Sequence, residues 1–204
     1  MMLSGRKMLL NGATGIKSAA CCLAVVAMMA LVTPSAVWSA PEKLVNSSDY
    51  KDKDFVKGNI SDYSDMVKGD DVEWLWVDSG VKLAQYKLKV GKVGNKSELR
   101  SKSMVESVKK IFGDAFDDMD VKAAKGTLTA DLCIYDAQNF SAGKAWIPFV
   151  GGHQMQAGIG IEMVLVDDKD KVVAKFRHFA REGAQIEAAA QEVSGDLIKY
   201  IVKN

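Results

Sequence analysis

The sequence predicts a single α+β domain in which two helices pack on one face of a mostly antiparallel sheet. Three observations support this prediction. Short segments with alternating apolar residues predict strands, two longer segments with helical spacing predict helices, and the order is strand, helix, strands, helix. We expect this domain to span residues 55–204, which is long enough to bury a sizeable core.

Two strands and a helix are expected in the first half of the domain. Trp74 and Trp76 lie on one side of a short strand at residues 72–77, and apolar residues alternate with lysines at residues 86–90. Asn95 followed by Glu98 fits a capping arrangement, so we expect the first helix to begin there. Its apolar stripe then continues to Met119 at helical spacing.

The sequence of the second half of the domain predicts three strands and a closing helix. Residues 126–136 alternate, and residues 159–166 and 172–176 alternate on either side of the polar turn 167–171, which predicts a hairpin. Apolar residues from Ile186 to Ile201 recur at helical spacing. We expect both helices on one face of the sheet, because that arrangement buries both apolar stripes.

Residues 1–39 have the layout of a secretory signal peptide. They contain Arg6, Lys7 and Lys17 and no acidic residue, and the last of these cations precedes the apolar run 19–32 and a small-residue segment. Cleavage after Ser39 places small residues at both recognition positions, so we expect a mature chain that starts at Ala40. The alternative is an uncleaved anchor, although the apolar run is shorter than the ~20 residues that a spanning helix needs.

Two segments connect the predicted signal peptide to the first strand. Residues 40–54 are polar and carry alternating charges, which predicts a flexible leader. Residues 58–66 are rich in turn formers with spaced apolar residues. We expect this stretch to cross the surface of the domain and to be held there by Ile60, Tyr63 and Met66.

The charge balance argues against a nucleic-acid partner. The chain has 27 Lys and Arg residues against 26 Asp and Glu residues, which gives a formal net charge of +1. A dedicated nucleic-acid binder usually has a strong basic excess. Without residues 1–39 the chain is slightly acidic.

The three cysteines predict no disulfide in the mature chain. Ser18 to Cys21 looks like a lipid-attachment box, but the apolar segment follows Cys21 and Cys22 instead of preceding them, so lipidation is not expected. Removal of the signal peptide leaves Cys133 as the single thiol. Its place in an alternating strand predicts a small buried hydrophobe, with a reactive thiol as the minor alternative.

No motif in the sequence identifies a catalytic, cofactor or metal site. His153 lies in a loop without metal-ligand spacing, and His178 is expected to be a partly exposed strand residue. The nucleophile elbow, the phosphate-binding glycine loop and paired metal-binding cysteines are absent from the sequence. The aspartates at 117–120 and 167–170 are expected to be a polar helix exit and a solvated turn. We therefore predict no cofactor and no metal.

One apolar loop is the candidate interaction surface. The connection from residue 137 to residue 156 is long for a hairpin, and its apolar residues argue against disorder. Trp146, Ile147, Phe149 and Val150 would contact a partner protein, or the membrane through residues 143–152. The alternative is that they extend the two strands and cap the core.

The stretch Gly58-Asn59-Ile60-Ser61-Asp62-Tyr63-Ser64, followed by Trp74, Gly80-Val81 and Tyr86, resembles the opening of uncharacterised bacterial envelope protein and lipoprotein families. Their members share a G-x-[LI]-S-D-Y-S start. A related domain of unknown function is similar to the second half, through the glycine-rich stretch 151–160, the turn 167–171 and the helix 186–201. The element order also resembles small periplasmic domains of the curli-secretion and TolB N-terminal type. This resemblance implies an envelope accessory or assembly role and supplies no catalytic residue.

Together these observations predict an exported, non-enzymatic module that binds another envelope component. We expect it in the periplasm or secreted, with an envelope protein or a cell-wall component as its partner. Two alternatives stay open. One is an enzyme whose site is assembled from scattered carboxylates and His153, and the other is a structural protein that an uncleaved signal tethers to the membrane.

Overall fold

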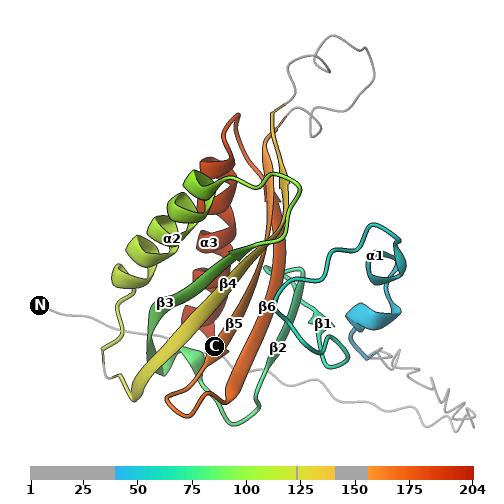
Figure 1. Cartoon of the computed structure of the whole chain (residues 1–204). Coiled ribbons are helices and arrows are strands. Elements are labelled where there is room, and N and C mark those ends of the chain that lie inside the picture. The colour runs from blue at the N-terminus through green and yellow to red at the C-terminus, as the bar shows by residue number, and fades with distance from the viewer. Residues whose placement is uncertain (1–39, 123, 141–155) are drawn as a thin grey trace, which may run out of the picture. The chain divides into compact units, whose positions relative to one another are not determined.

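The computed structural model describes residues 40–122, 124–140 and 156–204, which form a six-stranded sheet with two long helices on one face (Figure 1). The strand order is β1-β2-β6-β5-β4-β3. The α+β prediction with both helices on one side is therefore confirmed. The strands are β1 Val67–Lys68, β2 Trp74–Val77, β3 Tyr86–Asn95, β4 Gly126–Gln138, β5 Gly158–Val166 and β6 Val172–Arg181, and the long helices are α2 Lys102–Asp117 and α3 Ile186–Lys203.

The sheet is antiparallel except at one pair. β4, β5 and β6 form an antiparallel meander, and β2 pairs with β6, also in the antiparallel orientation. β3 pairs with β4 in parallel because α2 connects the two strands, and a parallel pair needs such a crossover. The predicted hairpin of β5 and β6 is confirmed, and the Asp167 carboxylate holds its turn by accepting the backbone N–H groups of Lys169 and Lys171.

The main core lies between the helices and the sheet. Phe112 of α2 and Leu197 of α3 are fully buried there, together with Ile161 and Phe176 of the sheet. The helical spacing of the apolar residues places them on the sheet-facing sides of both helices. None of the helices in the described ranges is both long and apolar enough to span a membrane.

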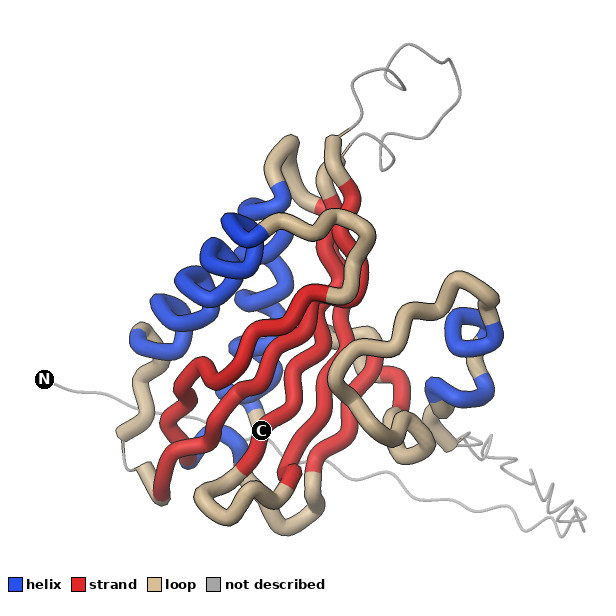
Figure 2. Tube along the Cα trace, viewed as in Figure 1, coloured by secondary structure: helices blue, strands red, loops and turns tan. Residues whose placement is uncertain are grey.

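A second core lies on the opposite side of the sheet, which we call the outer face. It is built by Leu44, Ile60, Tyr63, Met66 and Trp74. All but Trp74 come from residues 42–66, which we call the strap. The strap contains a 3-10 turn at Leu44–Asn46 and the four-residue helix α1 at Ser48–Lys51, and it crosses the outer face largely as loop (Figure 2).

The strap includes most of the segment 40–54, for which the sequence suggests a flexible leader. In the structure Leu44 of this segment is fully buried, and its N–H donates to the Met66 carbonyl at 3.0 Å. The Ser47 side chain is also buried, and it caps α1 by accepting the Tyr50 N–H. These contacts give residues 44–50 a place in the second core that their polar composition does not indicate.

The predicted start of the first helix is wrong. Asn95 is the last residue of β3, and its side chain stabilises a turn by accepting the Ser97 N–H and donating to the Leu99 carbonyl, both at 2.9 Å. The helix begins at Lys102, where the Ser101 hydroxyl accepts the Met104 N–H. Asn95 forms the hydrogen bonds typical of a cap, but it uses them in a turn ahead of the helix.

Candidate functional site

The outer face contains a buried carboxylate, Glu162, whose hydrogen-bonding capacity is used within the protein. Glu162 lies on β5 and is fully buried, and it forms an ion pair with the Arg177 guanidinium of β6 directly beside it. The Tyr63 hydroxyl donates to Oε1 at 2.8 Å, and the Ile60 N–H donates to Oε2 at 3.1 Å. A buried charge is stable only with such partners, because burial removes its hydration.

The strap supplies most of these partners, and Gly58 allows its close approach. The Gly58 N–H donates to the Tyr63 hydroxyl at 3.1 Å and lies 3.4 Å from Glu162 Oε1. A Cβ at position 58 would lie 2.5 Å from the Glu162 carboxyl carbon. The Gly58 carbonyl in turn accepts the Lys96 ammonium at 2.7 Å. The absence of a side chain at this position therefore lets the strap backbone reach the carboxylate.

Arg177 links the sheet, the strap and two aromatic rings. Its Nη1 donates to the Val56 carbonyl at 3.0 Å as well as to Glu162. Its guanidinium carbon lies 3.5 Å from the centre of the Tyr135 ring and 4.2 Å from the centre of the Phe55 ring. Arginine suits such a place, because its planar cation stacks on aromatic faces and is more weakly hydrated than an ammonium.

These contacts give a structural account of the stretch 58–64. Besides Gly58, Ile60 and Tyr63, the Asn59 side chain donates to the Leu132 carbonyl at 3.3 Å, and the Asp62 carbonyl accepts the Lys175 ammonium. The expectation that Ile60, Tyr63 and Met66 hold this stretch to the surface is confirmed, since all three are buried. The motif therefore acts in this chain to fasten the strap to the outer face.

A pocket of about 520 Å³ opens beside this cluster. Its wall includes Tyr135 and Asp136, which are consecutive in β4 and both face the pocket because Tyr135 is the extra residue of a β-bulge. Such bulges re-aim side chains near functional sites. Across from it, Gly160 makes room for the Tyr135 ring, because a Cβ there would lie 2.5 Å from a ring carbon.

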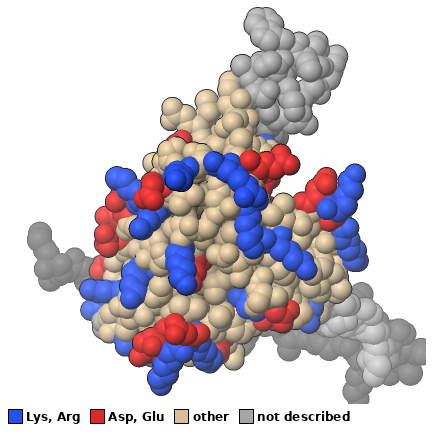
Figure 3. Space-filling model, in the orientation of Figure 1, with Lys and Arg blue, Asp and Glu red and all other residues tan. Residues whose placement is uncertain are grey.

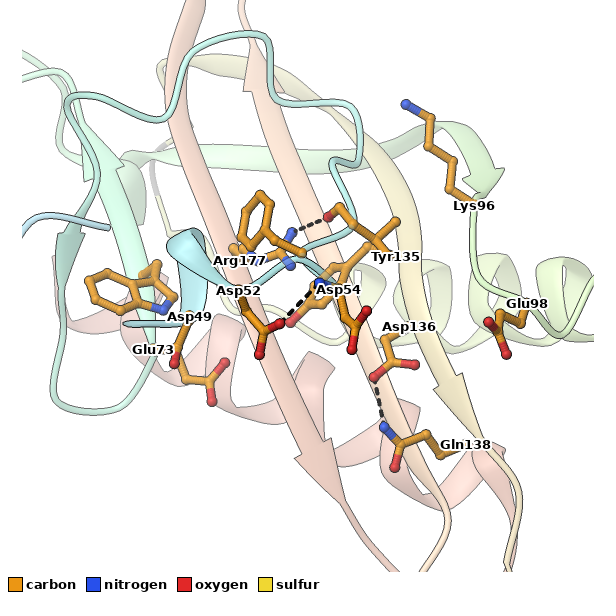
Figure 4. A pocket seen from close by; sticks show the side chains of 13 residues that line it. Asp49, Asp52, Asp54, Glu73, Lys96, Glu98, Tyr135, Asp136, Gln138 and Arg177 are labelled. Atoms are coloured by element: carbon orange, nitrogen blue, oxygen red, sulfur yellow. Dashed lines mark hydrogen bonds between the residues drawn. The ribbon is translucent and has the colours of Figure 1, made fainter. Parts of the chain in front are cut away.

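The rim of the pocket is rich in carboxylates. Figure 4 shows Asp52, Asp54 and Asp136 around the opening beside Arg177 and Tyr135, with Glu73 and Glu98 farther out on opposite sides. Six acidic side chains line the pocket: Asp49, Asp52, Asp54, Glu73, Glu98 and Asp136. Lys96 and Arg177 are the basic residues lining it, and Glu162 already neutralises Arg177.

None of these six carboxylates forms an ion pair with another described residue. Over the face visible in Figure 3, acidic and basic side chains are interspersed, so the carboxylate excess of the pocket is not a property of that whole face. In the described ranges no three His, Cys, Asp or Glu side chains converge in a way that could hold a metal ion.

Tyr63 and Tyr135 on the outer face remain protonated at neutral pH. Burial raises the pKa of Tyr63, and the neighbouring Glu162 charge raises it further. Burial also raises the pKa of Tyr135. Tyr135 is 7% exposed, and its hydroxyl has no hydrogen-bond partner among the described residues. It is therefore a neutral group at the pocket that can donate or accept a hydrogen bond.

His178 is buried on the helix side of β6, so the expectation of a partly exposed residue is wrong. Its Nδ1 accepts the Glu73 N–H at 3.4 Å, which leaves Nε2 to donate to the Asp196 carboxylate of α3 at 3.1 Å. These bonds join the sheet to α3. Cys133 is buried in β4 as expected for a small hydrophobe, and burial raises the pKa of its thiol.

The residues of the predicted interaction surface lie outside the described residues. This applies to Trp146, Ile147, Phe149 and Val150, and to His153. The outer-face cluster was not predicted as a site. Its signal in the sequence was an acid and an arginine, Glu162 and Arg177, within two strands that are otherwise mainly apolar.

No family model matches the chain, and no curated protein matches it. Similar solved structures include a PelC dodecamer from Paraburkholderia phytofirmans, with 10% identity, a TM-score of 0.40, and coverage of 63% of this chain and 91% of that chain. A single-residue variant of PelC from the same organism has 12% identity, a TM-score of 0.41, and coverage of 63% and 95%. A chain from Caulobacter crescentus CB15, provisionally classed as a lipoprotein, has 13% identity, a TM-score of 0.32, and coverage of 60% and 90%. At these TM-scores the likeness carries no conclusion about what this chain does.

Proposed function

We propose that the protein is an exported module of the bacterial cell envelope that acts by binding another envelope component, without catalysing a reaction. The signal-peptide layout of residues 1–39 and the resemblance of the stretch 58–64 to envelope proteins support export. The observation that favours a binding role over catalysis is the use of the buried charges. Glu162, Arg177 and Tyr63 bond to one another and to the strap, so they stabilise the outer face.

Charges that are used in this way differ from those of a catalytic centre, which must be free to reach a substrate. A general base or nucleophile must reach a substrate with its reactive atom. Both oxygens of Glu162 are occupied by protein donors, and its side chain is fully buried. The groups that do face solvent here are the carboxylates of the pocket rim, which suit recognition of a partner.

Export is tested by the mass of the chain recovered from a bacterial periplasm. The full chain is expressed with its own N-terminus, and the intact mass of the fractionated protein is measured. We expect a mature chain that starts at Ala40. A Ser39→Phe variant, which blocks the small-residue position, serves as the matched control and should keep its full mass. A wild-type chain that retains residues 1–39 in the membrane fraction would instead support a membrane tether.

The predicted contact surface is tested by crosslinking in the intact envelope followed by mass spectrometry. We expect wild-type protein to crosslink to an envelope protein or glycan, and the Trp146→Ser/Phe149→Ser variant to stay folded and lose that product. Val202→Ser removes another exposed apolar side chain and is the matched control, which should keep it. Unfolding of the double variant would show that the two aromatic residues belong to the core.

A further inference from the structure

The acidic pocket on the outer face has features that its carboxylates alone do not explain. Tyr135, at 7% exposure, points into it through a β-bulge, and its hydroxyl has no partner among the described residues. A tyrosine hydroxyl can both donate and accept a hydrogen bond. The strap and the sheet together thus leave one polar group of the pocket wall free for a ligand.

The charges around this hydroxyl define the ligand it would take. The six rim carboxylates line one opening and form no ion pairs with described residues. Like charges gathered without counterions repel one another and attract cations. An ammonium has three N–H donors, which carboxylates and a tyrosine hydroxyl can accept.

The spacing of the carboxylates favours an extended organic cation over a metal ion. Asp52 and Asp54 come from the strap, Asp136 from β4, and Glu98 from the β3–α2 connection, so they surround the opening from different elements (Figure 4). No three of them converge tightly enough for a metal ion. A cavity of about 520 Å³ is in the range that holds small molecules.

We propose that this pocket binds a small aliphatic polyamine, with its ammonium groups at the rim carboxylates and one N–H donated to the Tyr135 hydroxyl. The apolar parts of Phe55 and Trp74, which also line the pocket, would contact the methylene chain. Arg177 also lines the pocket and is paired with Glu162, so the unpaired charge of the pocket lies mainly in its rim carboxylates. This proposal does not depend on export or on the Trp146 surface.

The test is calorimetric titration of the purified full chain with spermidine, with Mg²⁺ at equal ionic strength as the competing probe. We expect saturable binding of one spermidine that excess Mg²⁺ does not abolish. Asp52→Asn/Asp54→Asn should weaken it about tenfold, since two charge contacts are lost. Asp117→Asn/Asp120→Asn changes the net charge equally at exposed positions outside the pocket, and should leave the affinity unchanged.

Tyr135→Phe separates recognition from folding. The hydroxyl has no partner among the described residues, so its removal should leave the urea midpoint of unfolding unchanged while it lowers spermidine affinity severalfold. Equal weakening by both aspartate pairs would show general charge attraction and overturn the proposal. Absence of saturable spermidine binding, or displacement by Mg²⁺ at equal ionic strength, would overturn it as well.

Discussion

Gly58 shows how a single residue controls whether the strap can pack against the outer face. Its N–H reaches a buried hydroxyl and a buried carboxylate because no side chain intervenes. Its backbone φ is not in the left-handed region, so an alanine would be excluded by contact alone. A substitution at position 58 therefore tests how closely the strap must approach the sheet, without a contribution from backbone strain.

We expect Gly58→Ala to lower the free energy of unfolding by about 2–4 kcal/mol, because the new methyl group overlaps Glu162 and pushes the strap away from a buried charge. Urea denaturation measures this change. Gly113→Ala is the control: Gly113 lies in α2 with nothing within 4 Å of its added Cβ, so it should stabilise by about 0.5–1 kcal/mol. Similar effects of the two substitutions would contradict the role given to Gly58.

The sequence predicted the strap side of this contact better than the sheet side. Ile60, Tyr63 and Met66 were expected to be buried, because spaced apolar residues in a turn-rich stretch need a surface to cover. The burial of Glu162 was not expected, since an acid at an alternating strand position is ordinarily solvent-facing. Its burial depends on a hydrogen bond from Tyr63, which lies 99 residues earlier, and no local pattern in the sequence indicates this contact.

At the scale of elements, the strands and the closing helix follow from periodicity, whereas the start of α2 does not. Asn95 and Glu98 form a cap signature, but residues 95–101 are needed to leave the sheet and turn back onto its helix side. A capping side chain can stabilise a turn or a helix with the same hydrogen bonds. The β-bulge at Tyr135 was also not predicted, although the core-facing residues change there from even positions, up to Ile134, to the odd position Ala137.

The start of α2 gives a second prediction. Ser101→Ala should lower the free energy of unfolding by about 1 kcal/mol, because the Met104 N–H loses its hydroxyl partner. Gln185→Ala, at the start of α3, should change it by less than about 0.5 kcal/mol, since Gln185 makes no capping bond. Urea denaturation of the two variants distinguishes them, and an unchanged Ser101 variant would contradict the assigned cap.

At the scale of the whole molecule, the domain has two cores on opposite sides of one sheet. The helix-side core follows from the apolar stripes in the sequence. The outer core depends on the strap, whose first half is polar on average and resembles a linker. Composition averaged over residues 40–54 hides Leu44, which is fully buried.

A third prediction tests whether this segment belongs to the folded domain. Leu44→Ala should lower the free energy of unfolding by about 2–5 kcal/mol, as expected for a large-to-small change in a packed core. Val202→Ala, at a position 55% exposed, should change it by less than about 0.5 kcal/mol. Chemical denaturation of both variants is the measurement. Equal midpoints would show that residues 40–54 do not contribute to stability.

The long separation between the strap and Glu162 also sets an order of assembly. A ribosome makes residues 58–63 first, and the carboxylate and guanidinium that receive them about a hundred residues later. Contacts this distant in sequence must wait for the intervening chain, and their closure is entropically costly. The strap consequently cannot bond to Glu162 and Arg177 until most of the chain has been made.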